Sequence, residues 1–175
     1  MKNKILEIVF RYVVMLLVAL PNLALFYFIF TPLTVYPTYF LLNLFYDASL
    51  ISKDIILVND LIPIELIEAC IAGSAYYLLF ILNFSTAKIN LNKRLKILFV
   101  SFFLFLILNI IRIFFLSILA ISGSSFFDAT HKLFWYSIST IFVVGIWFSL
   151  VKIFDIKEIP FYSDIKFLYK KTKKR

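Results

Sequence analysis

Three residues of this 175-residue chain have side chains suited to nucleophilic chemistry: a cysteine, a histidine and an arginine. Cys70 is the only cysteine and His131 the only histidine, and Arg112 is the single charge inside a long apolar stretch. A thiol becomes a nucleophile when a base or a nearby cation favours the thiolate. His131 could be that base and then the acid that protonates a leaving amine. Arg112 could stabilise the thiolate or an oxyanion formed during acyl transfer.

Three further polar residues lie close to these in the sequence. Asn109 comes one helical turn before Arg112, so its amide shares a face with the guanidinium and either orients it or joins two helices. Asp128 comes three residues before His131, and we expect it to cap a helix, with orientation of the imidazole as the alternative. Glu68 is expected in the first turn of a helix at the interface, with steering of substrate as the less favoured alternative.

No cofactor and no metal site are expected. The chain has one histidine, which excludes a multi-histidine metal site within one copy. Cys70 and His131 with one carboxylate could hold zinc, but this is the weaker interpretation. There is no phosphate loop, dinucleotide fingerprint, zinc spacing or nucleophilic serine motif.

The composition indicates that the elements carrying these residues lie in lipid. Hydrophobic residues make up 63% of the chain and charged residues 16%, against about 45–50% and about 25% in a soluble domain. We therefore predict an all-α integral membrane protein with one helical domain over residues 1–155 and a basic amphipathic tail over 156–175. Stretches almost free of charge predict four transmembrane helices, at about residues 12–30, 64–84, 97–122 and 132–151.

The basic residues give the expected orientation. Fifteen of the 18 Lys and Arg residues lie on one side of the four-span arrangement, and only Lys53 and Lys132 lie on the other. By the positive-inside rule, both termini of this multi-pass cell-membrane protein are then cytoplasmic. Cys70, Arg112 and His131 consequently share the outer half of the membrane.

The regions outside the predicted spans have their own patterns. The first external loop is expected to hold an interfacial helix over Pro37–Tyr46 and a small hairpin over Leu50–Val58. The first span is expected to end at the Thr31-Pro32 break, and Pro63 is expected in the first turn of the second span. The tail mixes apolar residues with lysines, which predicts contact with anionic lipid of the cytoplasmic leaflet and no nucleic-acid partner.

Arg112, Cys70 and His131 each have a structural interpretation as well. Arg112 could snorkel to the headgroups or pair with Glu68 or Asp128. A lone cysteine is most often an apolar filler, and an interfacial histidine can simply be solvated. An arginine deep in a span costs at least about 2.5–3.5 kcal/mol and usually faces a polar cavity, which favours a functional role for Arg112.

The order of these motifs resembles the exosortase/archaeosortase family. Cys70 lies in the run Glu68–Gly73 (EACIAG), Arg112 ends the run Asn109–Arg112 (NIIR), and His131 opens the last span. In that family a cysteine, an arginine in an Asn-x-x-Arg pattern and a histidine occur in this order on successive membrane helices. The resemblance covers about residues 51–149, and the short chain is closer to the compact archaeosortases. Many members have Ser or Thr and then Gly after the cysteine, whereas here the glycine comes one position later.

The resemblance implies a cysteine peptidase or transpeptidase that cleaves a C-terminal sorting signal of surface proteins. Cys70 would form a thioester, His131 would act as acid and base, and Arg112 would be their electrostatic partner. The implied substrates carry a short motif, a transmembrane helix and a basic tail, and the acceptor would be a membrane lipid or water. The alternative from the residues alone is a non-enzymatic membrane assembly or transport subunit with a structural Arg112.

Overall fold

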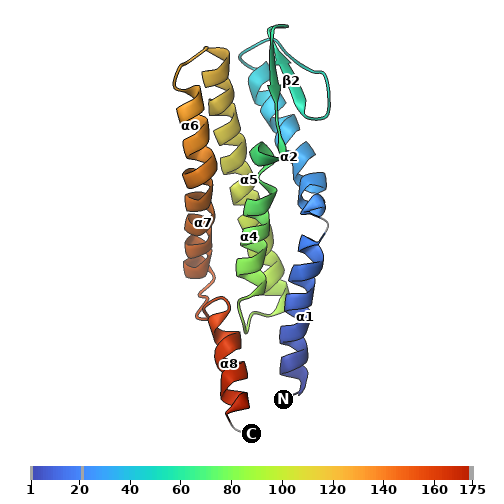
Figure 1. The fold of residues 1–175 in the computed structure, drawn as a ribbon, viewed down its shortest axis with the longest axis vertical. Coiled ribbons are helices and arrows are strands. Elements are labelled where there is room, and N and C mark those ends of the chain that lie inside the picture. Colours follow the sequence, from blue (N-terminus) through green and yellow to red (C-terminus); the bar gives the residue numbers. More distant parts are fainter. Residues whose placement is uncertain (1, 21, 174–175) are drawn as a thin grey trace.

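Helices α1 (Lys2–Ala19) and α2 (Ala24–Asn43) follow one another along one edge of an elongated bundle (Figure 1). The computed structural model describes residues 2–20 and 22–173. The break between the two helices includes Asn22 and Leu23, which have φ angles of 49° and 60°. The predicted first span over 12–30 is therefore wrong at both ends.

Helix α2 also contains Pro32 and Pro37. A proline is tolerated within a membrane helix when neighbouring groups satisfy the carbonyl it frees. The predicted break at Thr31-Pro32 is therefore wrong, and the predicted interfacial helix over Pro37–Tyr46 is mostly the last part of α2.

A three-stranded antiparallel sheet follows α2, with strands β1 (Ala48–Leu50), β2 (Ile55–Val58) and β3 (Ile62–Glu65) in the order β1-β2-β3. Leu50 pairs with Ile56, so the predicted hairpin over Leu50–Val58 is confirmed. Strand β3 was not predicted. It contains Pro63, which an edge strand tolerates because one side of its backbone needs no partner, so the predicted helical position of Pro63 is wrong.

The second helical segment is interrupted near its start. Helix α3 (Glu68–Ile71) ends at Ala72, which has a left-handed backbone (φ 60°, ψ 43°), and α4 (Gly73–Phe84) begins directly after it. The observed helical segment thus begins at Glu68, four residues later than the predicted start at residue 64, and it contains a break. At Gly73 a Cβ atom would lie 2.7 Å from the Tyr27 ring, so this close approach favours glycine.

The rest of the chain is almost entirely helical. Asn90 is the N-cap of helix α5 (Leu91–Ile121), and its side chain accepts a hydrogen bond from the Lys93 N–H at 2.8 Å. The last long segment runs through α6 (Phe127–Leu133), a five-residue π-helix over 134–138 and α7 (Ser139–Ile153), and α8 (Tyr162–Thr172) follows. Asp128 is not the expected N-cap, because α6 begins after Phe126 and Asp128 lies in its first turn.

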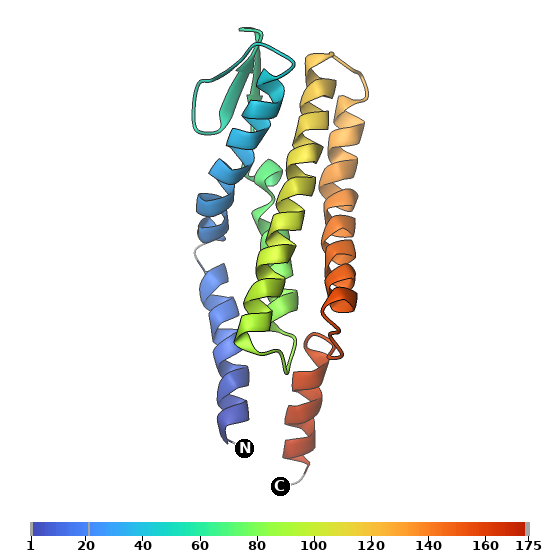
Figure 2. The same cartoon turned by 180° about the vertical axis from the view of Figure 1, so that it is seen from behind.

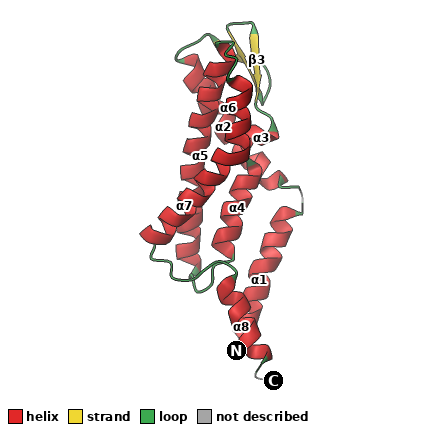
Figure 3. Ribbon diagram, turned by 60° about the vertical axis from the view of Figure 1, so that its left-hand side comes forward, coloured by secondary structure: helices red, strands yellow, loops and turns green. Residues whose placement is uncertain are grey.

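The segments pack side by side, with the sheet at one end (Figure 3). The start of α1 and the end of α8 lie at the opposite end (Figures 1 and 2). Helices α2 and α5 are long and apolar enough to cross a membrane, while 68–84 and 139–153 are shorter apolar segments. Large apolar side chains cover the outside as well as the core; Phe28 is 82% exposed and Phe99 72%.

Candidate functional site

The break at Ala72 creates an unusual row of backbone carbonyls beside Cys70. Carbonyl groups in the last turn of a helix lack intrahelical partners. Because α3 stops after Ile71, the carbonyl oxygens of Ala69, Cys70 and Ile71 are available to side chains of the neighbouring helix α5. The functional cysteine predicted from the sequence therefore lies at a backbone irregularity rather than within a regular helix.

Arg112 and Asn109 of α5 bind these carbonyls. Arg112 Nη2 donates to the Cys70 oxygen at 2.9 Å and to the Ala69 oxygen at 3.5 Å. Asn109 Nδ2 donates to the Cys70 oxygen at 3.0 Å and to the Ile71 oxygen at 3.4 Å. Both side chains are at least 95% buried. The structure thus brings Asn109 and Arg112 together on the backbone of Cys70.

Ser139 is the second partner of Arg112, and sequence reasoning missed it. Arg112 Nη1 donates to Ser139 Oγ at 2.7 Å, and the same hydroxyl donates to the Phe134 oxygen at 2.9 Å. This residue follows the π-helix directly, and π-helical turns occur often at functional sites. A serine in the apolar last span was the available signal, since polar side chains in such helices commonly join helices.

Cys70 and His131 line one pocket of about 330 Å³ between β3, α3, α5 and α6. Its walls are mostly apolar and include Ile113, Leu116 and Phe127. The cysteine is partly exposed and has no disulfide partner. The structure therefore brings the predicted nucleophile and the predicted base to the same cavity, with Arg112 behind the cysteine backbone.

Asp128 and Glu68, two further residues predicted for the site, do not line this pocket. The His131 ring stacks on Phe127 at a centroid distance of 5.5 Å and an interplanar angle of 23°. Among residues 2–20 and 22–173, no hydrogen bond joins Asp128 to His131. Glu68 is exposed and lines a separate groove of about 690 Å³ with Tyr27 and Lys53. The structure brings neither carboxylate to the imidazole.

The described part of the chain contains no group of three or more His, Cys, Asp or Glu residues placed to hold a metal ion.

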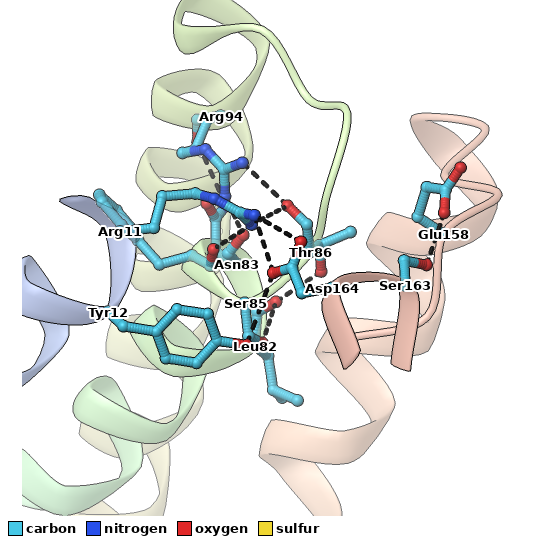
Figure 4. Close-up of polar contacts among 11 residues, drawn as sticks. Arg11, Tyr12, Leu82, Asn83, Ser85, Thr86, Arg94, Glu158, Ser163 and Asp164 are labelled. Atoms are coloured by element: carbon cyan, nitrogen blue, oxygen red, sulfur yellow. Dashed lines mark hydrogen bonds and ion pairs between the residues drawn. The ribbon is translucent and has the colours of Figure 1, made fainter. Parts of the chain in front are cut away.

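A second buried polar cluster, which sequence reasoning also missed, joins α1, α5, α8 and the loop after α4 (Figure 4). Both Asp164 carboxylate oxygens accept hydrogen bonds from Arg11 Nη2 at 2.7 Å. Arg11 Nη1 donates to the Phe84 and Thr86 oxygens at 3.0 and 3.1 Å. Arg94 of α5 donates to the Thr86 oxygen at 2.9 Å. We call the Arg11–Asp164 pair the α1–α8 clasp. The available signal for it in the sequence was Asp164, an acidic residue within a lysine-rich segment.

Comparison of the chain with protein-family models, curated proteins and solved structures finds no match. Any function of the chain must consequently be inferred from the geometry and chemistry of the site.

Proposed function

We propose that this chain is a membrane-embedded cysteine peptidase or transpeptidase of the kind found in exosortases and archaeosortases. The observation that supports this is the pocket shared by Cys70 and His131. A thiol and an imidazole on one cavity wall can exchange a proton across a substrate bound between them. The apolar walls would exclude water and accept an apolar segment beside the scissile bond.

Arg112 is assigned as the electrostatic partner of Cys70. Its guanidinium donates to the Cys70 oxygen at 2.9 Å, which places a positive charge directly behind the nucleophile. A nearby cation favours the thiolate over the thiol. Asn109 and Ser139 fix the positions of the cysteine backbone and the guanidinium, respectively.

The proposed reaction has two steps. His131 takes the thiol proton, and the sulfur attacks the scissile carbonyl carbon. The C–N bond breaks as His131 returns the proton to the leaving amine, which leaves a thioester on Cys70. An acceptor amine or hydroxyl of a membrane lipid, or water, then attacks the thioester, His131 takes its proton, and Cys70 leaves as the thiolate. The substrates would be proteins with a C-terminal sorting signal.

The proposed membrane arrangement has four passages: residues 2–43, 68–84, 91–121 and 127–153. Thirteen of the 16 basic residues in the described part of the chain lie at the end of the molecule opposite the sheet or on the chain leading to it, so that end would be cytoplasmic. Arg112 lies nine residues before the sheet-side end of α5, or about 14 Å along the helix. The pocket would then lie in the outer half of the membrane.

A second candidate is a non-enzymatic membrane assembly or transport subunit. The observation that favours it is that Arg112 donates hydrogen bonds to two backbone carbonyls and to the Ser139 hydroxyl. Such contacts would join α3, α5 and α7 without any chemistry. Under this alternative, replacing Cys70 has no effect on the biological role of the chain.

The single cysteine allows a direct test by thiol labelling. A membrane-impermeant maleimide, applied to intact cells, should label Cys70 from outside. The His131→Ala variant should react more slowly near neutral pH, because the thiol then lacks a neighbouring base to take its proton. Lys132→Ala is the matched control: Lys132 is adjacent in the sequence, exposed, and not part of the pocket wall.

Two results would count against the proposal. One is equal labelling rates for wild type, His131→Ala and Lys132→Ala, which would separate the thiol from the imidazole. The other is a Cys70→Ala strain in which surface proteins keep their normal processed masses, which would favour the non-enzymatic alternative.

A further inference from the structure

A cleft of about 450 Å³ lies between α1 and α8 at the end of the molecule opposite the sheet. Its lining is rich in charge, and basic side chains outnumber acidic ones by six to three. The acidic residues are Glu7, Glu158 and Asp164, and the basic residues are Lys4, Arg11, Lys88, Lys157, Lys166 and Lys170.

Ion pairs within the described residues neutralise only part of this charge. Arg11 pairs with Asp164, and Glu158 accepts a hydrogen bond from Ser163 (Figure 4). Glu158 also pairs with Lys88. Lys157 pairs with Asp155 outside the cleft.

Three lysines of the cleft have no carboxylate within ion-pair distance among residues 2–20 and 22–173: Lys4, Lys166 and Lys170. The Lys4 ammonium lies 5.0 Å from the centroid of the Phe167 ring, which holds it between α1 and α8. Buried Arg11 at the cleft wall also has an Nε–H without a hydrogen-bond partner in the described chain. Ammonium groups and a spare guanidinium donor suit a phosphate oxygen.

An apolar groove adjoins the cleft on α1. It is lined by Leu6, Val9, Phe10 and Val13 together with Glu7, which also lines the cleft. Leu6 and Phe10 are 71% and 64% exposed. The groove follows α1 from the basic end toward the middle of the molecule, the direction in which an acyl chain would enter the bilayer.

We propose that this cleft binds the phosphate of an anionic phospholipid, with one acyl chain along the α1 groove. Basic residues near a membrane surface attract anionic lipid electrostatically. The basic side chains of the cleft favour binding of a phosphate group. The adjoining apolar groove favours a phospholipid over free phosphate, because it can contact an acyl chain. The bound lipid would bridge α1 and α8 beside the clasp. This inference does not depend on the chemistry of Cys70.

The test is native mass spectrometry of the purified full-length protein in mild detergent. Phosphatidylglycerol and phosphatidylcholine are added in separate titrations. The cleft variant Lys4→Gln/Lys166→Gln/Lys170→Gln is compared with Lys96→Gln/Lys171→Gln/Lys173→Gln, which removes the same charge from exposed positions that do not line the cleft. The expected result is retention of one phosphatidylglycerol by wild type and the control variant, with at least about tenfold weaker retention by the cleft variant.

Three outcomes would overturn the proposal. Equal loss of phosphatidylglycerol in both triple variants would indicate a diffuse attraction rather than a site. Equal retention of phosphatidylcholine would remove the role of charge. Complete displacement of phosphatidylglycerol by millimolar inorganic phosphate would assign the cleft to free phosphate. Circular dichroism of each variant establishes that it is folded before the comparison is made.

Discussion

The Arg112 side chain shows how a buried charge is accommodated at the level of single residues. Its two terminal nitrogens donate to carbonyls of α3 and to Ser139, while its Nε lacks a hydrogen-bond partner within the described chain. Removing one acceptor leaves a charged donor unsatisfied, which costs more than the loss of a neutral hydrogen bond. Ser139 is thus as important to the guanidinium as the carbonyls are.

We expect Ser139→Ala to lower the free energy of unfolding by about 1–3 kcal/mol, because an Arg112 donor loses its acceptor. Ser149→Ala is the matched control: Ser149 is an exposed serine of the same helix whose hydroxyl donates only to the Gly145 oxygen. Its effect should stay within about 0.5 kcal/mol. Titration with SDS from a mild detergent gives both values, and equal effects would contradict the assigned role.

The sequence identified single residues well where their type was rare or where their spacing placed them beside a rare residue. Cys70, Arg112 and Asn109 were singled out by composition and spacing, and the structure brings them into contact. Ser139 was missed because its partner lies 27 residues earlier and serines are common in the chain. Asp128 was given an N-cap role because it is a good capping residue, but α6 begins after Phe126.

At the level of helices and strands, the clasp joins the first helix to the last. The Arg11 and Asp164 side chains are only 5% and 4% exposed. Removing one partner of a buried pair leaves the other charge uncompensated, which costs about 3–5 kcal/mol. The tail predicted as a lipid-bound amphipathic segment is therefore also anchored by a specific internal contact; residues 174 and 175 of that tail lie outside the described residues.

Asp164→Asn should accordingly destabilise the protein by about 3–5 kcal/mol. The exposed pair of Asp155 and Lys157, 3.5 Å apart, offers the control. Asp155→Asn should change the unfolding free energy by less than about 1 kcal/mol, since exposed ion pairs contribute little. The same SDS titration measures both variants, and a small effect at Asp164 would show that Arg11 is satisfied by carbonyls alone.

Glu158, in the linker between α7 and α8, should make the stability of the protein depend on pH. Hydrogen bonds from Lys88 and Ser163 hold the pKa of Glu158 below its usual value. A lowered carboxyl pKa stabilises the folded state above the unfolded pKa, near 4.5, and this stabilisation is lost as pH falls through the folded pKa. Glu158→Gln should therefore reduce stability at pH 7, by at most about 1 kcal/mol for a solvent-screened pair. Thermal unfolding from pH 7 to pH 3.5 should show the two proteins converging at the acid end.

Helix and strand boundaries were predictable only where local signals were strong. The long apolar stretch ending near Ser122 gave α5, and Ser52-Lys53-Asp54 gave the hairpin. The break at Asn22 and Leu23 was missed because the helix end was assigned to Thr31-Pro32, whereas α2 tolerates Pro32 within the packed bundle. Strand β3 was missed because Ile62–Glu65 pairs with β2, a contact that no local pattern reports.

At the scale of the whole molecule, charge and shape agree with a protein that crosses the bilayer along its long axis. Most basic residues lie at one end or lead to it, the small sheet lies at the other, and apolar side chains cover the sides. These features support the proposed orientation, with the sheet and the Cys70 pocket toward the outside.

Engineered cysteines in a Cys70→Ala background test this orientation. Ser52→Cys lies in the exposed turn between β1 and β2, and Asn92→Cys lies at the exposed start of α5. An impermeant maleimide should label Ser52→Cys in intact cells and Asn92→Cys only after permeabilisation. The reverse pattern would invert the topology, and labelling of both positions in intact cells would contradict a bilayer-spanning arrangement.

The α1–α8 clasp also determines when, during synthesis of the chain, the first helix can be fixed in place. Asp164 is synthesised 153 residues after Arg11, once the helices from α1 to α7 have been made. The Phe84 and Thr86 oxygens, which also accept hydrogen bonds from Arg11, are made earlier but carry no full negative charge. A nascent chain that stops before α8 would contain every long apolar segment and still leave this guanidinium uncompensated. The firm attachment of the first helix therefore waits for translation to reach the last.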